Sequence, residues 1–168
     1  MTGASSGIGK ATCKILTKYG AQVVGIGRNE KSLSSLKDEG NVFNYVVADI
    51  TKDGECQRIV ETTVKLFNGE LTTVVNGAGG LQGGSMGDIN IENYHYNMKL
   101  NTQAPFEIMT HAIPYLKQQH EKDKNMCPSI INVSSVNGKQ VCLLFWSFWI
   151  DYIKLCIISF LTLDFLII

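Results

Sequence analysis

Three closely spaced glycines near the start of the chain could hold an anion. Gly3, Gly7 and Gly9 stand in the stretch TGASSGIG, residues 2–9, and a helical pattern follows at once. Gly3 permits a sharp turn, Gly7 leaves room for a pyrophosphate, and Gly9 allows the next helix to pack closely. The first turn of that helix offers free N–H groups to an anion. We therefore predict a phosphate cradle formed by Gly3, Ser5, Ser6, Gly7, Ile8 and Gly9.

A single arginine, Arg28, follows the apolar run 21–27, which we predict to be a buried strand. In a dinucleotide-binding fold, the residue just past the second strand meets the adenosine ribose. A guanidinium there suits a 2′-phosphate through paired, charge-assisted hydrogen bonds, whereas an acidic residue would bind the 2′-hydroxyl. Arg28 therefore favours NADP as the cofactor; the plainer alternative is a solvated arginine in a loop.

The stretch TGASSGIG resembles the cofactor loop of the short-chain dehydrogenase/reductase family, in the classical branch that includes 3-oxoacyl-carrier-protein reductases. The resemblance covers residues 2–140. It implies hydride transfer between the nicotinamide and a small-molecule carbonyl or alcohol, and a tendency to form homo-oligomers. It also implies further cofactor contacts at Asp49, Ile50, Asn76, Ala78 and Gly79. Asp49 has an alternative role as the cap of a helix that begins near Thr51.

Two polar residues match catalytic positions of that family. Asn101, in NTQAPF, resembles the active-site asparagine, whose backbone carbonyl is thought to hold a water in a proton relay. Ser135, after the strand-like run 129–134, resembles the serine that polarises the substrate carbonyl. The residues alone leave plainer alternatives open: Asn101 could satisfy free backbone groups in a kinked helix, and Ser135 could belong to a turn.

The sequence departs from the family pattern in its catalytic part. Gly77 replaces the second asparagine of the Asn-Asn-Ala-Gly element, and the expected Tyr-x-x-x-Lys pair is missing after Ser135. Phe148 stands near the expected place of the tyrosine, while Tyr152 is followed four residues later by Cys156. General acid–base catalysis typically contributes about 10²–10⁴-fold in rate. We therefore expect an impaired oxidoreductase, with a non-catalytic nucleotide-binding fragment as the alternative.

Helical and strand patterns alternate along the chain and must position these residues. We predict helices over 8–19, 30–40, 54–67 and 93–116, and strands over 21–27, 42–48, 71–76 and 129–134. Pro105 should interrupt the last helix and Pro114 should end it, before an exposed loop over 118–126. The expected fold class is α/β, a Rossmann-like doubly wound parallel sheet. It is incomplete, because the family's first strand and C-terminal strands have no counterpart here.

The overall composition excludes several classes of function. Fifteen basic and fifteen acidic residues give a formal net charge of zero, so we expect no nucleic-acid partner. Five cysteines without CxxC spacing and three scattered histidines predict neither a metal site nor a disulfide framework. Reduced thiols and the lack of a signal-peptide pattern favour a cytoplasmic location.

The last part of the chain is a different kind of sequence. Leu, Ile and Phe make up 16 of the 26 residues in 143–168, whereas all 16 glycines occur by Gly138. We therefore divide the chain into a partial dinucleotide-binding domain, 1–140, and a hydrophobic tail, 141–168.

Two origins of the tail remain open. Val141-Cys142 can be encoded by GTNTGT, which includes a splice-donor form, so the tail could be intron read-through. It could also be a genuine extension that attaches the protein to a membrane. Asp151, Lys154 and Asp164 make a stable span costly, and we expect weak membrane association at most.

Overall fold

The computed structural model describes residues 1–83 and 89–135. The predicted tail, 141–168, lies outside the described residues, and so do Phe148 and Tyr152, near the expected place of the Tyr-x-x-x-Lys pair.

The described elements alternate between helix and strand, as predicted. Their order is α1 (Gly7–Lys18), β1 (Val24–Gly27), α2 (Glu30–Asp38), β2 (Asn44–Val47), α3 (Glu55–Leu66), β3 (Thr73–Asn76), α4 (Ile91–Met98), the π-helical turn η1 (Lys99–Gln103), α5 (Ala104–Lys122) and β4 (Ser129–Asn132). The strands are shorter than predicted, because ladder pairing starts only at Val24↔Asn44 and Thr73↔Ser129.

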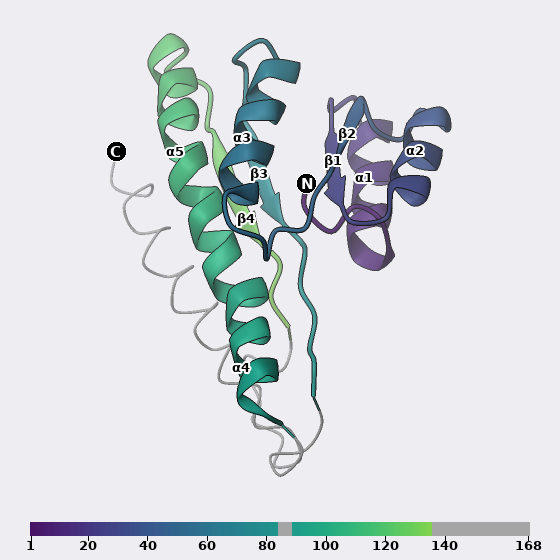
Figure 1. The fold of residues 1–168 in the computed structure, drawn as a ribbon. Helices are drawn as coiled ribbons and strands as arrows, with labels where there is room; N and C mark the ends of the chain where they lie inside the picture. Colours follow the sequence, from purple (N-terminus) through teal and green to yellow (C-terminus); the bar gives the residue numbers. More distant parts are fainter. Residues whose placement is uncertain (84–88, 136–168) are drawn as a thin grey trace.

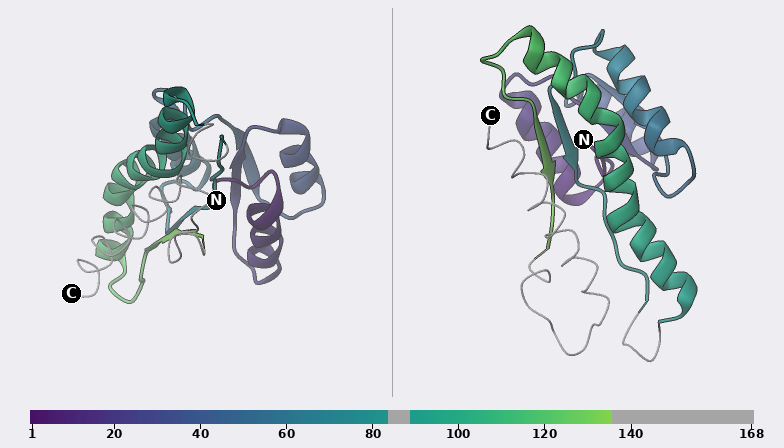
Figure 2. Two further views of the ribbon diagram at one scale, coloured as in Figure 1. Left: turned by 90° about the horizontal axis from the view of Figure 1, so that it is seen from below. Right: turned by 90° about the vertical axis from the view of Figure 1, so that its left-hand side faces the viewer.

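The elements form three layers, which confirms the doubly wound α/β fold. The described strands form two parallel pairs, β1 with β2 and β3 with β4. Helices α1 and α2 lie on one side of the strands, and α3 and α5 lie on the other (Figures 1 and 2). One buried cluster joins α3 and α5 to the strands, and a second includes Cys13, Leu33 and Leu36 beneath α1 and α2.

Within 1–83 and 89–135, backbone hydrogen bonds link the two strand pairs only through the first two residues of the chain. Met1 N donates to Val24 O at 3.1 Å, and Thr2 N donates to Val75 O at 2.9 Å. Thr2 also forms an isolated parallel bridge with Ile26. Met1 and Thr2 therefore occupy the end of a central strand position between β1 and β3, and the N-terminus lies in the middle of the fold (Figure 1).

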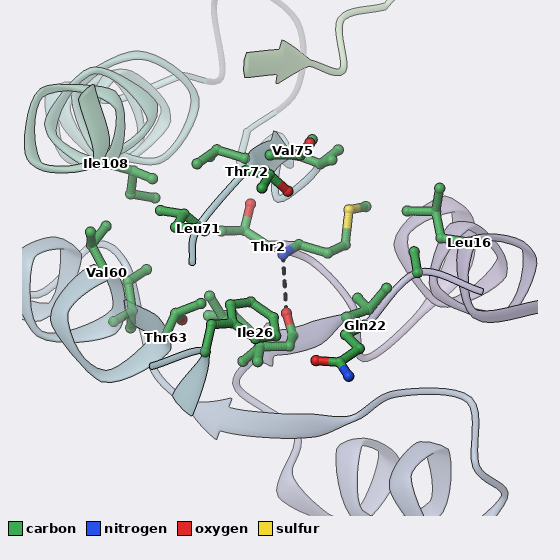
Figure 3. A pocket seen from close by; sticks show the side chains of 18 of the residues that line it. Thr2, Leu16, Gln22, Ile26, Val60, Thr63, Leu71, Thr72, Val75 and Ile108 are labelled. Carbon is green, nitrogen blue, oxygen red and sulfur yellow. Dashed lines mark hydrogen bonds between the residues drawn. The ribbon is translucent and has the colours of Figure 1, made fainter. Parts of the chain in front are cut away.

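A cavity of about 310 Å³ extends that central position away from Thr2. Its lining is mainly apolar, and Figure 3 shows Val60 and Ile108 on one side of it and Leu16 on the other. Within the described residues, β1 and β3 lack a full shared neighbour strand, which agrees with the incomplete sheet expected from the sequence.

Pro114 does not end the last helix, contrary to the prediction. It lies inside α5, which continues to Lys122, so the first half of the predicted loop 118–126 is helical. The helix continues because its inner face is buried on both sides of the proline, at Ala112 and Leu116. That burial outweighs the hydrogen bond that proline cannot donate. Within 1–83 and 89–135, no helix is both long and apolar enough to cross a membrane.

The strand predicted over 129–134 forms as β4 and is partly exposed. Only β3 pairs with it among the described strands, and the side chain of Ile131 is 50% exposed. In the described part of the chain, β4 is therefore an edge strand with one uncovered face.

Candidate cofactor-binding site

A pocket of about 440 Å³ lies where β1, β2 and β3 end and α1 begins. This is the edge at which parallel α/β sheets bind ligands, because helix N-termini and flexible loops meet there. Eleven of the predicted cofactor residues line it: Gly3, Ser5, Ser6, Gly7, Ile8, Gly9, Arg28, Asp49, Ile50, Ala78 and Gly79. Thr2, Gly27, Gly77 and Leu100 add to the lining without having been predicted. We call this pocket the cradle.

Two glycines of the loop pack against backbone, and the third borders open space. Gly3 adopts φ +72°, and a Cβ there would lie 2.7 Å from Gly77 O. A Cβ on Gly9 would overlap the carbonyl oxygen of Gly3, so α1 packs directly on the backbone of the loop. Gly7 adopts φ +48°, and a Cβ there would have no atom within 4 Å, which leaves open space at the start of the helix.

The start of α1 presents backbone N–H groups to the cradle. The N-cap residue Ser6 has extended backbone, and within the described residues its side chain makes no capping hydrogen bond. The first hydrogen bond of the helix runs from Lys10 N to Ser6 O at 3.0 Å. The N–H groups of Gly7, Ile8 and Gly9 precede it and have no helical acceptor. Together with the helix dipole, these donors suit a phosphate.

Thr2 holds the opposite wall of the cradle, a role that sequence reasoning missed. Its Oγ1 accepts hydrogen bonds from Gly77 N and Ala78 N, both at 3.1 Å, and the residue is 2% exposed. The glycine that departs from the family pattern is required by this packing. A Cβ on Gly77 would lie 2.9 Å from Thr2 O and 2.6 Å from the Cε of Met1.

Arg28 and Asp49 supply the charge at the rim. Arg28 is exposed, and its Nη1 donates to the hydroxyl of Tyr96 at 3.4 Å. Asp49 Oδ1 accepts from Thr51 N at 3.1 Å and from Thr51 Oγ1 at 2.7 Å, so it caps a turn. Burial opposes ionisation of Asp49. The hydrogen bonds from Thr51 and the charge of Arg28 outweigh it and hold the pKa of the carboxyl below its ordinary value.

Asn101 lies in the π-helical turn, buried beside the cradle. Its Oδ1 accepts from Gly80 N at 3.1 Å, and its Nδ2 donates to Gly80 O at 2.7 Å. The helix widens there because Pro105 has no N–H for the Asn101 carbonyl. The side chain thus satisfies backbone groups, as the plainer alternative proposed, while the catalytic role implied by the resemblance concerns the carbonyl.

Asn76 and Ser135 lie outside the lining of the cradle. Asn76 is 1% exposed, and its Nδ2 donates to Asn132 Oδ1 at 2.8 Å, so it joins β3 to β4. Ser135 is exposed and follows β4 by three residues. Because β3 and β4 are parallel, Ser135 lies toward the same edge of the sheet as Ala78 and Gly79.

No group of three or more metal-ligating side chains occurs within 1–83 and 89–135. Cys13 and Cys56 are buried free thiols, and Cys127 is exposed. Burial and the nearby carboxylate of Glu107 raise the pKa of Cys56 to about 12, so this thiol suits the core rather than nucleophilic chemistry.

Comparisons with known proteins agree with this geometry. The family description "short chain dehydrogenase" matches residues 1–147. An uncharacterized oxidoreductase of Staphylococcus epidermidis is 33% identical over 139 residues, which cover 82% of this chain and 57% of that protein. The chain therefore spans little more than half the length of this relative.

Two solved structures share the fold and carry a bound cofactor. NADH-dependent reductase A1-R′, complexed with NAD, has a TM-score of 0.77 and 29% identity over 89% of this chain and 63% of that one. The F189W variant of actinorhodin polyketide ketoreductase, with NADPH, has a TM-score of 0.84 and 25% identity over 98% of this chain and 63% of that one. On these matches and on the glycine cradle, the chain belongs to the short chain dehydrogenase family.

Proposed function

We propose that the cradle binds NADP and that the chain belongs to an oxidoreductase that interconverts a carbonyl and an alcohol. The observation that carries the proposal is the convergence of eleven predicted residues on one pocket at the start of α1. That pocket offers N–H donors for a pyrophosphate and an arginine at its rim.

The preference for NADP over NAD rests on Arg28. Its guanidinium lies at the end of β1, where a dinucleotide fold places the adenosine ribose, and it is accessible to solvent. Asp49 is the only carboxylate among the residues that line the cradle. It accepts hydrogen bonds from Thr51 and is stabilised by the charge of Arg28. The similar proteins do not decide the choice, because one was solved with NAD and another with NADPH.

When bound, the nicotinamide supplies or accepts the hydride. The chain's own contributions are to hold the phosphates at Gly7, Ile8 and Gly9, and to polarise a substrate oxygen through the hydroxyl of Ser135. A proton donor at the place of the family's tyrosine is missing from the printed sequence. At about 10²–10⁴-fold per acid–base group, turnover by this chain should be slow.

A non-catalytic nucleotide-binding fragment is the second candidate. The same gap in the sequence favours it, because Phe148 and Tyr152 do not reproduce the Tyr-x-x-x-Lys spacing. The two candidates share the cradle and differ only in turnover.

Cofactor binding tests the proposal directly. Titration of the 168-residue protein with NADPH and NADH, followed by nicotinamide fluorescence, should show tighter binding of NADPH. Arg28→Asp should weaken NADPH binding at least tenfold and leave NADH within about threefold, because only the 2′-phosphate needs the guanidinium. Lys31→Asp is the matched control, since it makes the same charge change at an exposed residue outside the cradle lining. Equal affinity of the parent protein for both cofactors would refute the NADP assignment.

Turnover separates the two candidate functions. NADPH oxidation with several ketones and 3-oxoacyl thioesters should be slow but measurable if Ser135 acts in catalysis, and Ser135→Ala should abolish it. Binding without any turnover would assign the chain to the non-catalytic class.

A further inference from the structure

The strand-to-helix connection after β3 forms one wall of the cradle and is anchored by side chains at three points. We call residues 77–82 the wall segment. Thr2 accepts from its first two N–H groups, Asn101 binds Gly80, and Asn97 binds Gln82. Gly79, which lines the cradle together with Gly77 and Ala78, lies between the first anchor and the other two.

Asn97 pairs with both backbone groups of Gln82, as Asn101 does with those of Gly80. Its Oδ1 accepts from Gln82 N at 2.8 Å, and its Nδ2 donates to Gln82 O at 2.8 Å. The residue is 1% exposed on α4, and its neighbours Tyr94 and Tyr96 are not buried. A buried amide without partners would be costly, so its conformation and that of Gln82 are coupled.

The spacing of the two amide anchors matches the spacing of their targets. Asn97 and Asn101 are four residues apart, which corresponds to about 6 Å along a helix. Gly80 and Gln82 are two residues apart, which corresponds to about 6.6 Å in extended backbone. The helix therefore holds two alternate residues of the wall segment, in the opposite chain direction.

This alternation bears on the backbone groups of Gly79. In extended backbone, the N–H and C=O of successive residues point to opposite sides. Gly80 and Gln82 direct theirs toward the helix, so an extended course of the segment would turn those of Gly79 away from it. Gly79 is also one of the residues that line the cradle.

We propose that Asn97 is a positioning residue for the cradle, which fixes the wall segment so that the backbone of Gly79 faces a bound dinucleotide. The inference rests on the proposed function of the cradle. Asn97 itself does not line the pocket and acts through Gln82.

The test uses Asn97→Leu, which keeps the volume and removes both hydrogen bonds, and Asn97→Ser in case the leucine variant does not fold. The dissociation constant for NADPH should rise about tenfold for Asn97→Leu. Gln119→Leu is the matched control: Gln119 is also buried, and its Nε2 donates to Gly69 O at 2.6 Å, outside the cradle lining. It should lower the urea midpoint by a similar amount and leave the dissociation constant within twofold.

Amide hydrogen exchange without cofactor supplies an independent readout. Asn97→Leu or Asn97→Ser should accelerate exchange at Gly80 as well as at Gln82, because the whole wall segment loosens. Gln119→Leu should change neither amide. If the parent protein does not bind NADPH, the proposed function is refuted. Amide hydrogen exchange at Gly80 and Gln82 then tests the role of Asn97 by itself. Unchanged exchange at Gly80, or an unchanged dissociation constant in a parent that binds, would overturn the inference.

Discussion

At the scale of single residues, the cradle depends on positions where any side chain would meet backbone. A Cβ on Gly9 would overlap the carbonyl of Gly3, and a Cβ on Gly3 would meet Gly77 and Ala78. Backbone atoms cannot move aside as a flexible side chain can, so these contacts fix both the shape of the loop and its distance from the wall.

Gly9→Ala should therefore damage stability and cofactor binding together. Overpacking against backbone typically costs about 1–3 kcal/mol, and relief would require α1 to shift away from the loop. We expect a lower urea midpoint and at least tenfold weaker NADPH binding, measured on the same preparation.

Gly20→Ala is the control for this substitution. Gly20 follows α1, adopts φ +88° and has open space where a Cβ would lie. Its replacement should cost about 1–2 kcal/mol through backbone strain alone and leave cofactor affinity unchanged. Wild-type binding by Gly9→Ala would show that the loop can rearrange freely.

At the scale of elements, the long rod formed by α4, η1 and α5 carries the anchors of the wall segment (Figure 1). Pro105 and Pro114 both lie in this rod, but only Pro105 adjoins the π-helical turn. That turn includes Asn101, so the π-helical widening occurs at the point where the helix binds the wall segment.

Pro114 has no such role, and its replacement should stabilise the protein. It is exposed inside α5 and cannot donate to Thr110 O. Proline is about 3 kcal/mol less favourable than alanine inside a helix, and alanine gives back about 0.4–1 kcal/mol through the freer unfolded chain. We expect Pro114→Ala to raise the free energy of unfolding by about 2 kcal/mol in urea titration.

Lys117→Ala serves as the reference for this change, since Lys117 is exposed on the same helix. It should shift stability by less than about 0.5 kcal/mol. A destabilised Pro114→Ala variant would mean that the proline sets a bend on which α5 packing depends.

At the scale of the whole molecule, Met1 and Thr2 alone among the described residues join the two strand pairs by backbone hydrogen bonds. Val24 O and Val75 O accept hydrogen bonds from these residues. In a strand the N–H of a residue points to the same side as its C=O. The N–H groups of Val24 and Val75 therefore also face the gap, by which we mean the space between β1 and β3. The gap continues into the apolar cavity of about 310 Å³ (Figure 3).

An engineered extension of four apolar, β-branched residues in front of Met1 should therefore stabilise the fold. It can pair with β1 and β3 and fill a cavity whose walls lack packing partners. We expect a gain of at least about 2 kcal/mol in the free energy of unfolding. Slower hydrogen exchange at the amides of Val24 and Val75 should accompany it.

A Gly-Ser extension of equal length is the control, because it offers the same backbone without apolar side chains. It should give little stabilisation. Equal stability of the two extended proteins would mean that the cavity has already closed in solution by movement of the two halves.

The sequence by itself determined the features that depend on neighbours along the chain. Gly3, Gly7 and Gly9 predict the cradle because a turn and a helix start are set by local backbone freedom. Asn29 likewise caps α2 through a local contact, accepting from Ser32 N. The alternating helix and strand patterns were sufficient for the three-layer fold, since hydrophobic periodicity decides which face each element buries.

Tertiary structure alone decided how residues distant in sequence meet. Thr2 reaches Gly77 across 75 residues, and Asn97 reaches Gln82 across 15, through side chains whose types fit many environments. The helix α5 continues through Pro114 because other residues of the helix are buried. The side chain of Asn76 binds Asn132 because β4 pairs beside β3. Local propensity differs by at most a few kcal/mol between such alternatives, so long-range packing and hydrogen bonding determine the outcome.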